Sequence, residues 1–264
     1  MQNDLDLFKV GKLSDAIQAA TENVKSNQSD IVMRSRLVEY LCVASQFDRA
    51  DKQLEVIASQ DPKTTVRILE LRQLIRASQA RGEMFTKGRL PEFISTPPDH
   101  VDFRLRALVS LREGNISESS EWLIKAEDAR PSISGVMGET HFNEFRDLDD
   151  FFGGVLEVFT STGKYFWVPM EQIVEANFTA PKRPIDKSWC EVDLSLRDGP
   201  SGLVYVPAIY PKIDGADYRE ALASGLETDW LDNGYGITRG EGLRSFIVGE
   251  ESYSIHELTS ITIE

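Results

Sequence analysis

The chain has 264 residues, of which 41% are hydrophobic and 27% are charged, so its composition is that of a globular protein and excludes bulk disorder. Its 43 acidic and 29 basic side chains give a formal net charge of −14, which repels phosphate backbones and anionic lipid surfaces. We therefore expect neither nucleic acid nor a membrane as a partner.

The cysteines and the N-terminus bear on the cellular location. Cys42 and Cys190 lie far apart in apolar stretches, which predicts free buried thiols rather than a disulfide framework. The first residues are acidic and polar, unlike the basic start of a signal peptide. No apolar run approaches the roughly 20 residues that span a bilayer. We expect a cytoplasmic protein.

Residues 1–131 carry the spacing of helical hairpins. Apolar side chains recur at helical intervals, and Leu13 with Ala16 is followed 34 positions later by Phe47 with Ala50. This is the period of tetratricopeptide units, in which a small residue lets two antiparallel helices approach closely. One hairpin cannot bury its own apolar face, so such hairpins stack. The sequence therefore predicts a tetratricopeptide-like helical domain over 1–131.

The repeat is incomplete. The second unit closes at Asp61-Pro62, as tetratricopeptide hairpins do, and a third unit runs from Gly114 to Pro131. Residues 81–90 do not continue the pattern, and 93–99 form a proline-rich break. An irregular helical bundle is the alternative interpretation.

The composition changes from residue 132, where glycine, aromatic and β-branched residues become more frequent. Asp147 to Thr160 is expected to form one helix, since its apolar residues fit a single face. The Gly153-Gly154 pair inside it suggests close packing against another element. The acidic residues 147–150 would then interact favourably with the helix dipole.

Strands dominate the rest of the chain. Dense β-formers bounded by turn residues predict strands at 164–169, 174–179, 190–196 and 203–208, and further strands in the tail. A short helix is expected from Ala216 to Ala223. The second domain, residues 132–264, is thus predicted to be α+β with a mainly antiparallel sheet. The fold class of the whole chain is α+β, with helical hairpin repeats preceding this smaller domain.

The sequence offers little catalytic chemistry. His100, His141 and His256 share no metal-ligand spacing, and neither a phosphate-binding loop nor a nucleophile elbow is present. We predict a non-enzymatic protein with no catalytic residues, no metal and no cofactor. A small-molecule-binding regulator or an uncharacterised enzyme, acting through the C-terminal domain, is the alternative, and it requires a deep pocket with convergent polar groups.

A protein partner is the favoured interpretation. In tetratricopeptide geometry the first helix of each pair lines the concave side, where it can receive an amphipathic helix. That geometry nominates Val32, Ser35, Arg36 and Glu39 as partner-binding residues. A purely structural subunit that forms homo-oligomers is a third hypothesis.

Aromatic side chains of the second half are alternative anchors. Tyr165, Phe166 and Trp167 are consecutive, so a strand places Tyr165 and Trp167 on one face of the sheet and Phe166 on the other. At least one face is expected to be core. Tyr165, Trp167 and Trp230 are the residues nominated as exposed anchors for a partner.

An ordered series of motifs runs through nearly the whole chain. The first half contains Leu37-Val38-Glu39-Tyr40-Leu41-Cys42, Gln46-Phe47-Asp48-Arg49-Ala50 and Gln53-Leu54-Glu55 running to Asp61-Pro62. The second half contains Val155-Leu156-Glu157-Val158, Gly163-Lys164-Tyr165-Phe166-Trp167-Val168-Pro169, Trp189, Tyr210-Pro211 and Thr228-Asp229-Trp230. In this series the chain resembles the ImpE/SciE/TagJ family of accessory proteins of bacterial type VI secretion systems.

The resemblance implies a function that composition and spacing do not. It implies a cytoplasmic accessory component, or adaptor, without enzymatic activity. It further implies binding to the small subunit of the contractile sheath, with an indirect influence on sheath recycling by the AAA+ ATPase of the secretion system.

Overall fold

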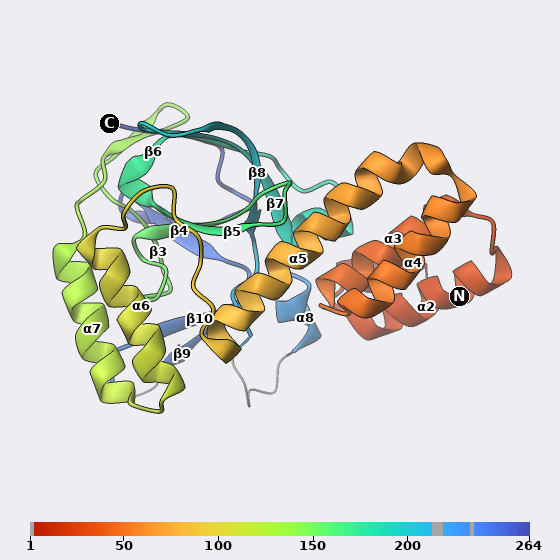
Figure 1. The fold of residues 1–264 in the computed structure, drawn as a ribbon, viewed down its shortest axis with the longest axis horizontal. Helices are drawn as coiled ribbons and strands as arrows, with labels where there is room; N and C mark the ends of the chain where they lie inside the picture. The colour runs from red at the N-terminus through yellow and green to blue at the C-terminus, as the bar shows by residue number, and fades with distance from the viewer. Residues whose placement is uncertain (1–2, 213–218, 233–234) are drawn as a thin grey trace.

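The computed structural model describes residues 3–212, 219–232 and 235–264. Its first part consists of paired helices (Figure 1). The pairs are α1 (Asp4–Lys9) with α2 (Leu13–Ser26), α3 (Ile31–Val43) with α4 (Phe47–Gln60), and α6 (Asp99–Arg112) with α7 (Ile116–Ala129). A short 3-10 helix, η1 (Pro62–Thr64), and the long helix α5 (Thr65–Lys87) stand between the second and third pairs. No helix among the described residues is both long and apolar enough to cross a membrane.

One turn type closes all three hairpins. In each turn a residue adopts left-handed backbone geometry, and the next N–H bonds the carbonyl five positions earlier, at 2.8 to 3.0 Å. The left-handed residues are Gly11, Ser45 and Gly114, with φ of 77°, 55° and 81°. Five positions after each comes a small side chain that is 0% exposed in the hairpin seam: Ala16, Ala50 and Ser119. The first two hairpins therefore reproduce the 34-residue period, and the third repeats the same turn.

Helix α5 interrupts the repeat, as residues 81–90 predict. It ends at Gly88, whose φ of 75° is left-handed, and an extended strap of residues 89–98 follows. The α6–α7 hairpin consequently lies apart from the other two, against the sheet, and α5 runs diagonally between them (Figure 1). The hairpins do not stack into one continuous solenoid.

The second part is built on an eight-stranded antiparallel sheet, in the order β2-β1-β13-β6-β7-β8-β4-β5. These strands are β1 (Gly135–Met137), β2 (Thr140–Phe142), β4 (Val155–Phe159), β5 (Tyr165–Pro169), β6 (Ile173–Phe178), β7 (Trp189–Leu196), β8 (Ser201–Pro207) and β13 (Ser260–Ile263). A three-stranded sheet joins β12 (Glu251–Ser254), β11 (Ser245–Val248) and β3 (Phe145–Asp147), and β9 (Thr228–Asp232) pairs with β10 (Thr238–Gly242). Short helices are η2 (Met170–Gln172), η3 (Pro184–Lys187) and α8 (Glu220–Ala223).

These elements confirm the predicted fold class, paired helices followed by an antiparallel α+β part. The four strands expected between 164 and 208 all form, within two residues of their predicted starts. The expected helix from Ala216 to Ala223 is α8 in its last four residues, and its start, 216–218, lies outside the described residues.

The predicted helix from Asp147 to Thr160 is wrong. This stretch contains the end of β3, a turn and all of β4. Every residue of β4 is buried between two apolar cores. The first core packs one face of the sheet against the helices, and the second, which includes Leu156 and Val158, covers the other face. A strand buried on both faces has a continuous apolar run, which periodicity cannot distinguish from a buried helix.

The Gly153-Gly154 pair does mark close packing against another element, as expected. A Cβ on Gly153 would lie 2.9 Å from Nη2 of Arg104, and one on Gly154 would lie 2.9 Å from Nδ1 of His100. Both contacts come from α6. The pair therefore lets the third hairpin settle directly on the turn before β4.

The acidic residues before this pair satisfy backbone groups rather than a helix dipole. The Asp147 carboxylate accepts the N–H of Asp149 at 2.8 Å, and Asp149 in turn accepts the N–H groups of Phe151 and Gly240, both at 2.9 Å. Asp147 and Asp149 are 0% exposed. These bonds fix the turn and tie it to β10.

Candidate functional site

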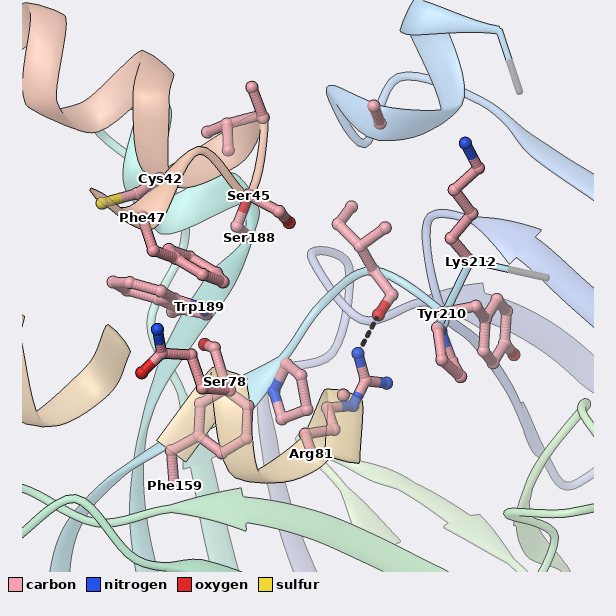
Figure 2. A pocket seen from close by; sticks show the side chains of 18 of the residues that line it. Cys42, Ser45, Phe47, Ser78, Arg81, Phe159, Ser188, Trp189, Tyr210 and Lys212 are labelled. Carbon is pink, nitrogen blue, oxygen red and sulfur yellow. Dashed lines mark hydrogen bonds between the residues drawn. The ribbon is translucent and has the colours of Figure 1, made fainter. Parts of the chain in front are cut away.

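A groove of about 460 Å³ lies where the helical hairpins meet the sheet. The turn between α3 and α4 forms one side, α5 forms the floor, and the segments that flank β7 and β8 complete it. Figure 2 shows Phe47 and Trp189 on one wall, Tyr210 and Lys212 on the opposite wall, and Arg81 between them.

The groove is aromatic and apolar, with positive charge at one end. Its aromatic side chains are Phe47, Phe85, Phe159, Trp189 and Tyr210. Arg81 and Lys212 are its ionisable cations, and no aspartate or glutamate lines it in the described part of the chain. A protein of net charge −14 therefore presents here a largely apolar surface, with two basic side chains at one end.

The groove continues along α4 and α5. Phe47 and Gln79 also line an adjoining hollow of about 390 Å³, which ends at the ion pair between Arg72 and Asp51, 2.6 Å long. The site is thus an elongated furrow rather than a closed pocket.

A buried ion-pair network supports the floor of the groove. Arg81 donates from Nε and Nη2 to the two oxygens of Glu157, at 2.8 and 2.6 Å, and from Nη1 to the Ile209 carbonyl at 3.1 Å. Arg244 also donates to Glu157, and its Nε lies 3.3 Å from Asp147. Glu157, Arg244 and Asp147 are all 0% exposed.

Two cations decide the charge state of the central carboxylate. Burial alone would raise the pKa of Glu157, but Arg81 and Arg244 outweigh burial and lower it to about 2. Glu157 therefore stays ionised at neutral pH. The network joins α5, β4 and the segment after β10 by charge, and Arg81 is its charged member that lines the groove in the described part of the chain.

Tyrosines complete the network. Tyr165 donates from its hydroxyl to Glu157, Trp167 donates from Nε1 to the Tyr165 oxygen at 2.6 Å, and Tyr210 donates to Asp147 at 2.7 Å. Burial raises the pKa of Tyr165 and of Tyr210 well above 10, so both remain neutral donors. Every member has a structural partner, and the described residues hold no group of three His, Cys, Asp or Glu that could bind a metal ion.

Two of the predicted anchors are core residues. Tyr165 and Trp167 are 3% and 0% exposed, packed between the sheet and the helices, so their prediction as surface anchors is wrong. Phe166, on the other face of β5, packs against the second apolar core. Sequence alternation separates the faces correctly, but both faces of this strand are covered.

Trp230 does reach the surface. It is 39% exposed on β9, and its ring meets that of Tyr210 edge to face, with centroids 5.9 Å apart. It therefore lies next to the groove through Tyr210, although it does not line it.

The residues predicted on α3 divide into two groups. Val32 is 70% exposed, and Ser35 and Arg36 are partly exposed. Glu39 instead faces the chain's own η3 segment, where Nη1 of Arg183 lies 3.7 Å away and its side chain is 14% exposed. Burial raises the pKa of Glu39 to about 7, although Arg183 lowers it. The protein itself thus covers part of the predicted concave face.

None of the seven predicted residues lines the groove. Several groove residues nevertheless stood out in the sequence: Phe47 in the repeat, and Trp189 and Tyr210-Pro211 in the motif series. Their gathering at one place depends on how the hairpins dock on the sheet, which no local pattern encodes. No sequence pattern indicated Arg81 as a groove residue, since residues 81–90 are notable only for interrupting the repeat.

Comparisons with known proteins find related sequences and one related structure. The profile of a family described as "ImpE protein" matches residues 139–262. The chain is 29% identical over 260 residues to the type VI secretion system accessory component TagJ of Pseudomonas aeruginosa, covering 98% of this chain and 90% of that protein. It also superposes on the crystal structure of protein VPA1032 from Vibrio parahaemolyticus with a TM-score of 0.90, at 25% identity, over 99% of this chain and 97% of that one.

Proposed function

We propose that this protein, a member of the ImpE family, is a non-enzymatic accessory component of a type VI secretion system that acts by binding another protein in its groove. The observation that carries the proposal is the furrow itself, which is open and aromatic. Such a surface suits a partner polypeptide better than it suits a reaction, because its polar groups do not converge on one point.

We propose the small subunit of the contractile sheath as the partner, bound through a helical segment. An amphipathic helix can lay its apolar face on Phe47, Phe85 and Trp189, which is a common mode of peptide recognition. Polar groups at one end of that helix would lie near Arg81, whose charge Glu157 already balances, and near Lys212. An effect on the AAA+ ATPase would then be indirect, through the sheath.

The predicted partner-binding residues that lie at the surface remain part of this proposal, as contacts to the partner outside the groove. Val32, Ser35 and Arg36 lie on α3, and Trp230 stands beside Tyr210. We also retain the division of the chain into domains 1–131 and 132–264, and the groove draws its lining from both. We also propose a cytoplasmic location, which the family resemblance implies.

A substitution that fills the furrow tests the proposal. Gln79 is exposed on α5 and lines the groove and its extension, so Gln79→Trp obstructs the furrow without removing any core contact. Gln18→Trp makes the same exchange on exposed α2 and serves as the matched control. Titration calorimetry with the purified small sheath subunit should show at least a tenfold loss of affinity for Gln79→Trp, about 1.4 kcal/mol.

The control and the wild type should bind alike. Equal affinity of all three proteins would place the partner elsewhere on the surface. Absence of binding by the wild type at micromolar concentrations, with both proteins folded, would refute the sheath partner. Light scattering at several concentrations separates partner binding from self-association of the chain.

A further inference from the structure

A second hollow, separate from the groove, opens at one end of the large sheet. Its volume is about 220 Å³. It lies where β4 and β7 end and where β5 and β8 begin, on the face of the sheet that carries the second apolar core. The register between β4 and β8 is the single pair of Phe159 with Tyr205, and the hollow occupies the side on which these strands separate.

The hollow is lined almost entirely by hydrocarbon. Val158, Val168 and Leu194 form its floor and are 2 to 3% exposed. Among the residues that the structure describes, no charged side chain and no histidine lines it. Its polar side chains are the hydroxyls of Thr160 and Ser201, and that of Thr160 already bonds Thr162 at 2.8 Å.

Its rim exposes large apolar side chains. Leu203, on β8, is 51% exposed, and Ile94, on the strap after α5, is 42% exposed. The strap is held in place because Glu92 pairs with β5 through two backbone hydrogen bonds, of 2.8 and 3.1 Å. The hollow is therefore a preformed feature of packed elements, since a fixed strap and four strands define its walls.

Water is a poor occupant of such a space. A bound water needs two to four polar partners, which these walls do not supply. An apolar cavity of about 150 Å³ accommodates benzene, so 220 Å³ has room for a ring with a short alkyl chain. The open ends of β-barrels and related sheets are frequent places for such ligands.

We propose that this hollow is a binding site for a neutral, apolar small molecule of about the size of an alkylbenzene. The site is independent of the groove, because the two share no lining residue. The absence of charge in the lining disfavours ligands that carry a carboxylate or an ammonium group on the inserted portion.

The proposal is tested with n-butylbenzene as the probe, on the full chain labelled at its Val and Leu methyl groups. Saturable shifts should concentrate on the methyl groups of Val158, Val168 and Leu194. Val204→Phe projects extra volume into the site from a half-buried position on β8, and should weaken binding at least tenfold. Val174→Phe makes the same exchange on the exposed side of β6, outside the site, and should bind like the wild type.

The charged analogue 4-phenylbutyrate should bind at least tenfold more weakly than n-butylbenzene. Circular dichroism of both variants verifies that they are folded. Absence of saturable shifts at these methyl groups up to the solubility limit of the probe would overturn the proposal. Equal binding by the wild type and Val204→Phe would do the same, because the probe would then bind elsewhere.

Discussion

The carboxylate of Glu157, on β4, accepts two hydrogen bonds from the guanidinium of Arg81, on α5, at 2.8 and 2.6 Å. The two residues are 76 positions apart, and their contact attaches the long helix to the sheet. Because α5 forms the floor of the groove, this ion pair fixes the floor on the sheet. Arg244 and Asp147 balance the charge behind it, so that two cations face two carboxylates.

Arg81→Met should lower the free energy of unfolding by about 3 kcal/mol, since the buried carboxylate of Glu157 loses a bidentate partner and keeps Arg244 alone. Glu157→Gln should cost a similar amount, because Arg81 and Arg244 both lose their shared carboxylate. The double variant should lose less than the sum of the two, because the interaction between Arg81 and Glu157 is then removed only once. Urea unfolding of the four proteins measures the coupling, and strictly additive losses would show that the pair contributes no interaction of its own.

Replacing Gly154 and Gly82 by alanine should change the stability of the protein in opposite directions. Gly154→Ala places a methyl group 2.9 Å from His100 and 3.0 Å from Arg130, and should destabilise the protein by about 1–3 kcal/mol. Gly82, inside α5, has nothing within 4 Å of its ideal Cβ, so Gly82→Ala should stabilise the helix by about 0.5–1 kcal/mol. Thermal unfolding of both variants gives the two signs, and a neutral Gly154→Ala would mean that the α6 side chains yield easily.

The hairpins were predictable because their determinants are local. A left-handed turn residue, a small seam residue and a closing proline all lie within one repeat, as at Ser45, Ala50 and Pro62. The sheet was predictable for the same reason, since β-formers between turn residues need no knowledge of their neighbours. These patterns suffice for the fold class.

The site was less predictable, because whether a strand or helix face is covered depends on how distant parts of the chain pack against it. Tyr165 and Trp167 are residue types that often anchor a partner at a protein surface, yet here the helices cover them. Glu39 has the position of a concave-face residue, yet η3 occupies that face. The groove collects Phe47, Arg81 and Trp189 from three separate elements, and only their docking brings them together.

Substitutions of Trp167 and Trp230, both predicted as partner anchors, should differ in their effect on stability. Trp167 is completely buried, so Trp167→Ala should cost about 3–5 kcal/mol of stability. Trp230→Ala removes one exposed edge-to-face contact with Tyr210 and should cost about 1 kcal/mol. Chemical denaturation measures both, and calorimetry with the small sheath subunit then assigns any binding role to Trp230. A Trp167→Ala protein as stable as the wild type would contradict the described core.

The stability of the contact between α3 and η3 should fall as the pH rises. The pKa of Glu39 is raised from its ordinary value of 4.5 to about 7 by burial, which outweighs the attraction of Arg183 and is reinforced by Asp186. Arg36, on the same helix as Glu39, lowers this pKa by a smaller amount. The folded state therefore favours the protonated carboxyl. Its contribution is complete below pH 4.5 and is lost as the pH rises through 7.

Glu39→Gln isolates this effect, because glutamine preserves the shape of the protonated side chain and does not titrate. Wild type and variant should have similar stability at pH 4.5, and the wild type should become the less stable by on the order of 3 kcal/mol at pH 8. The difference between their unfolding free energies, measured by urea denaturation at several pH values, removes contributions from every other titrating group. Parallel stability profiles of the two proteins would show that Glu39 is ionised in the folded state at neutral pH, and that solvent reaches the α3–η3 contact.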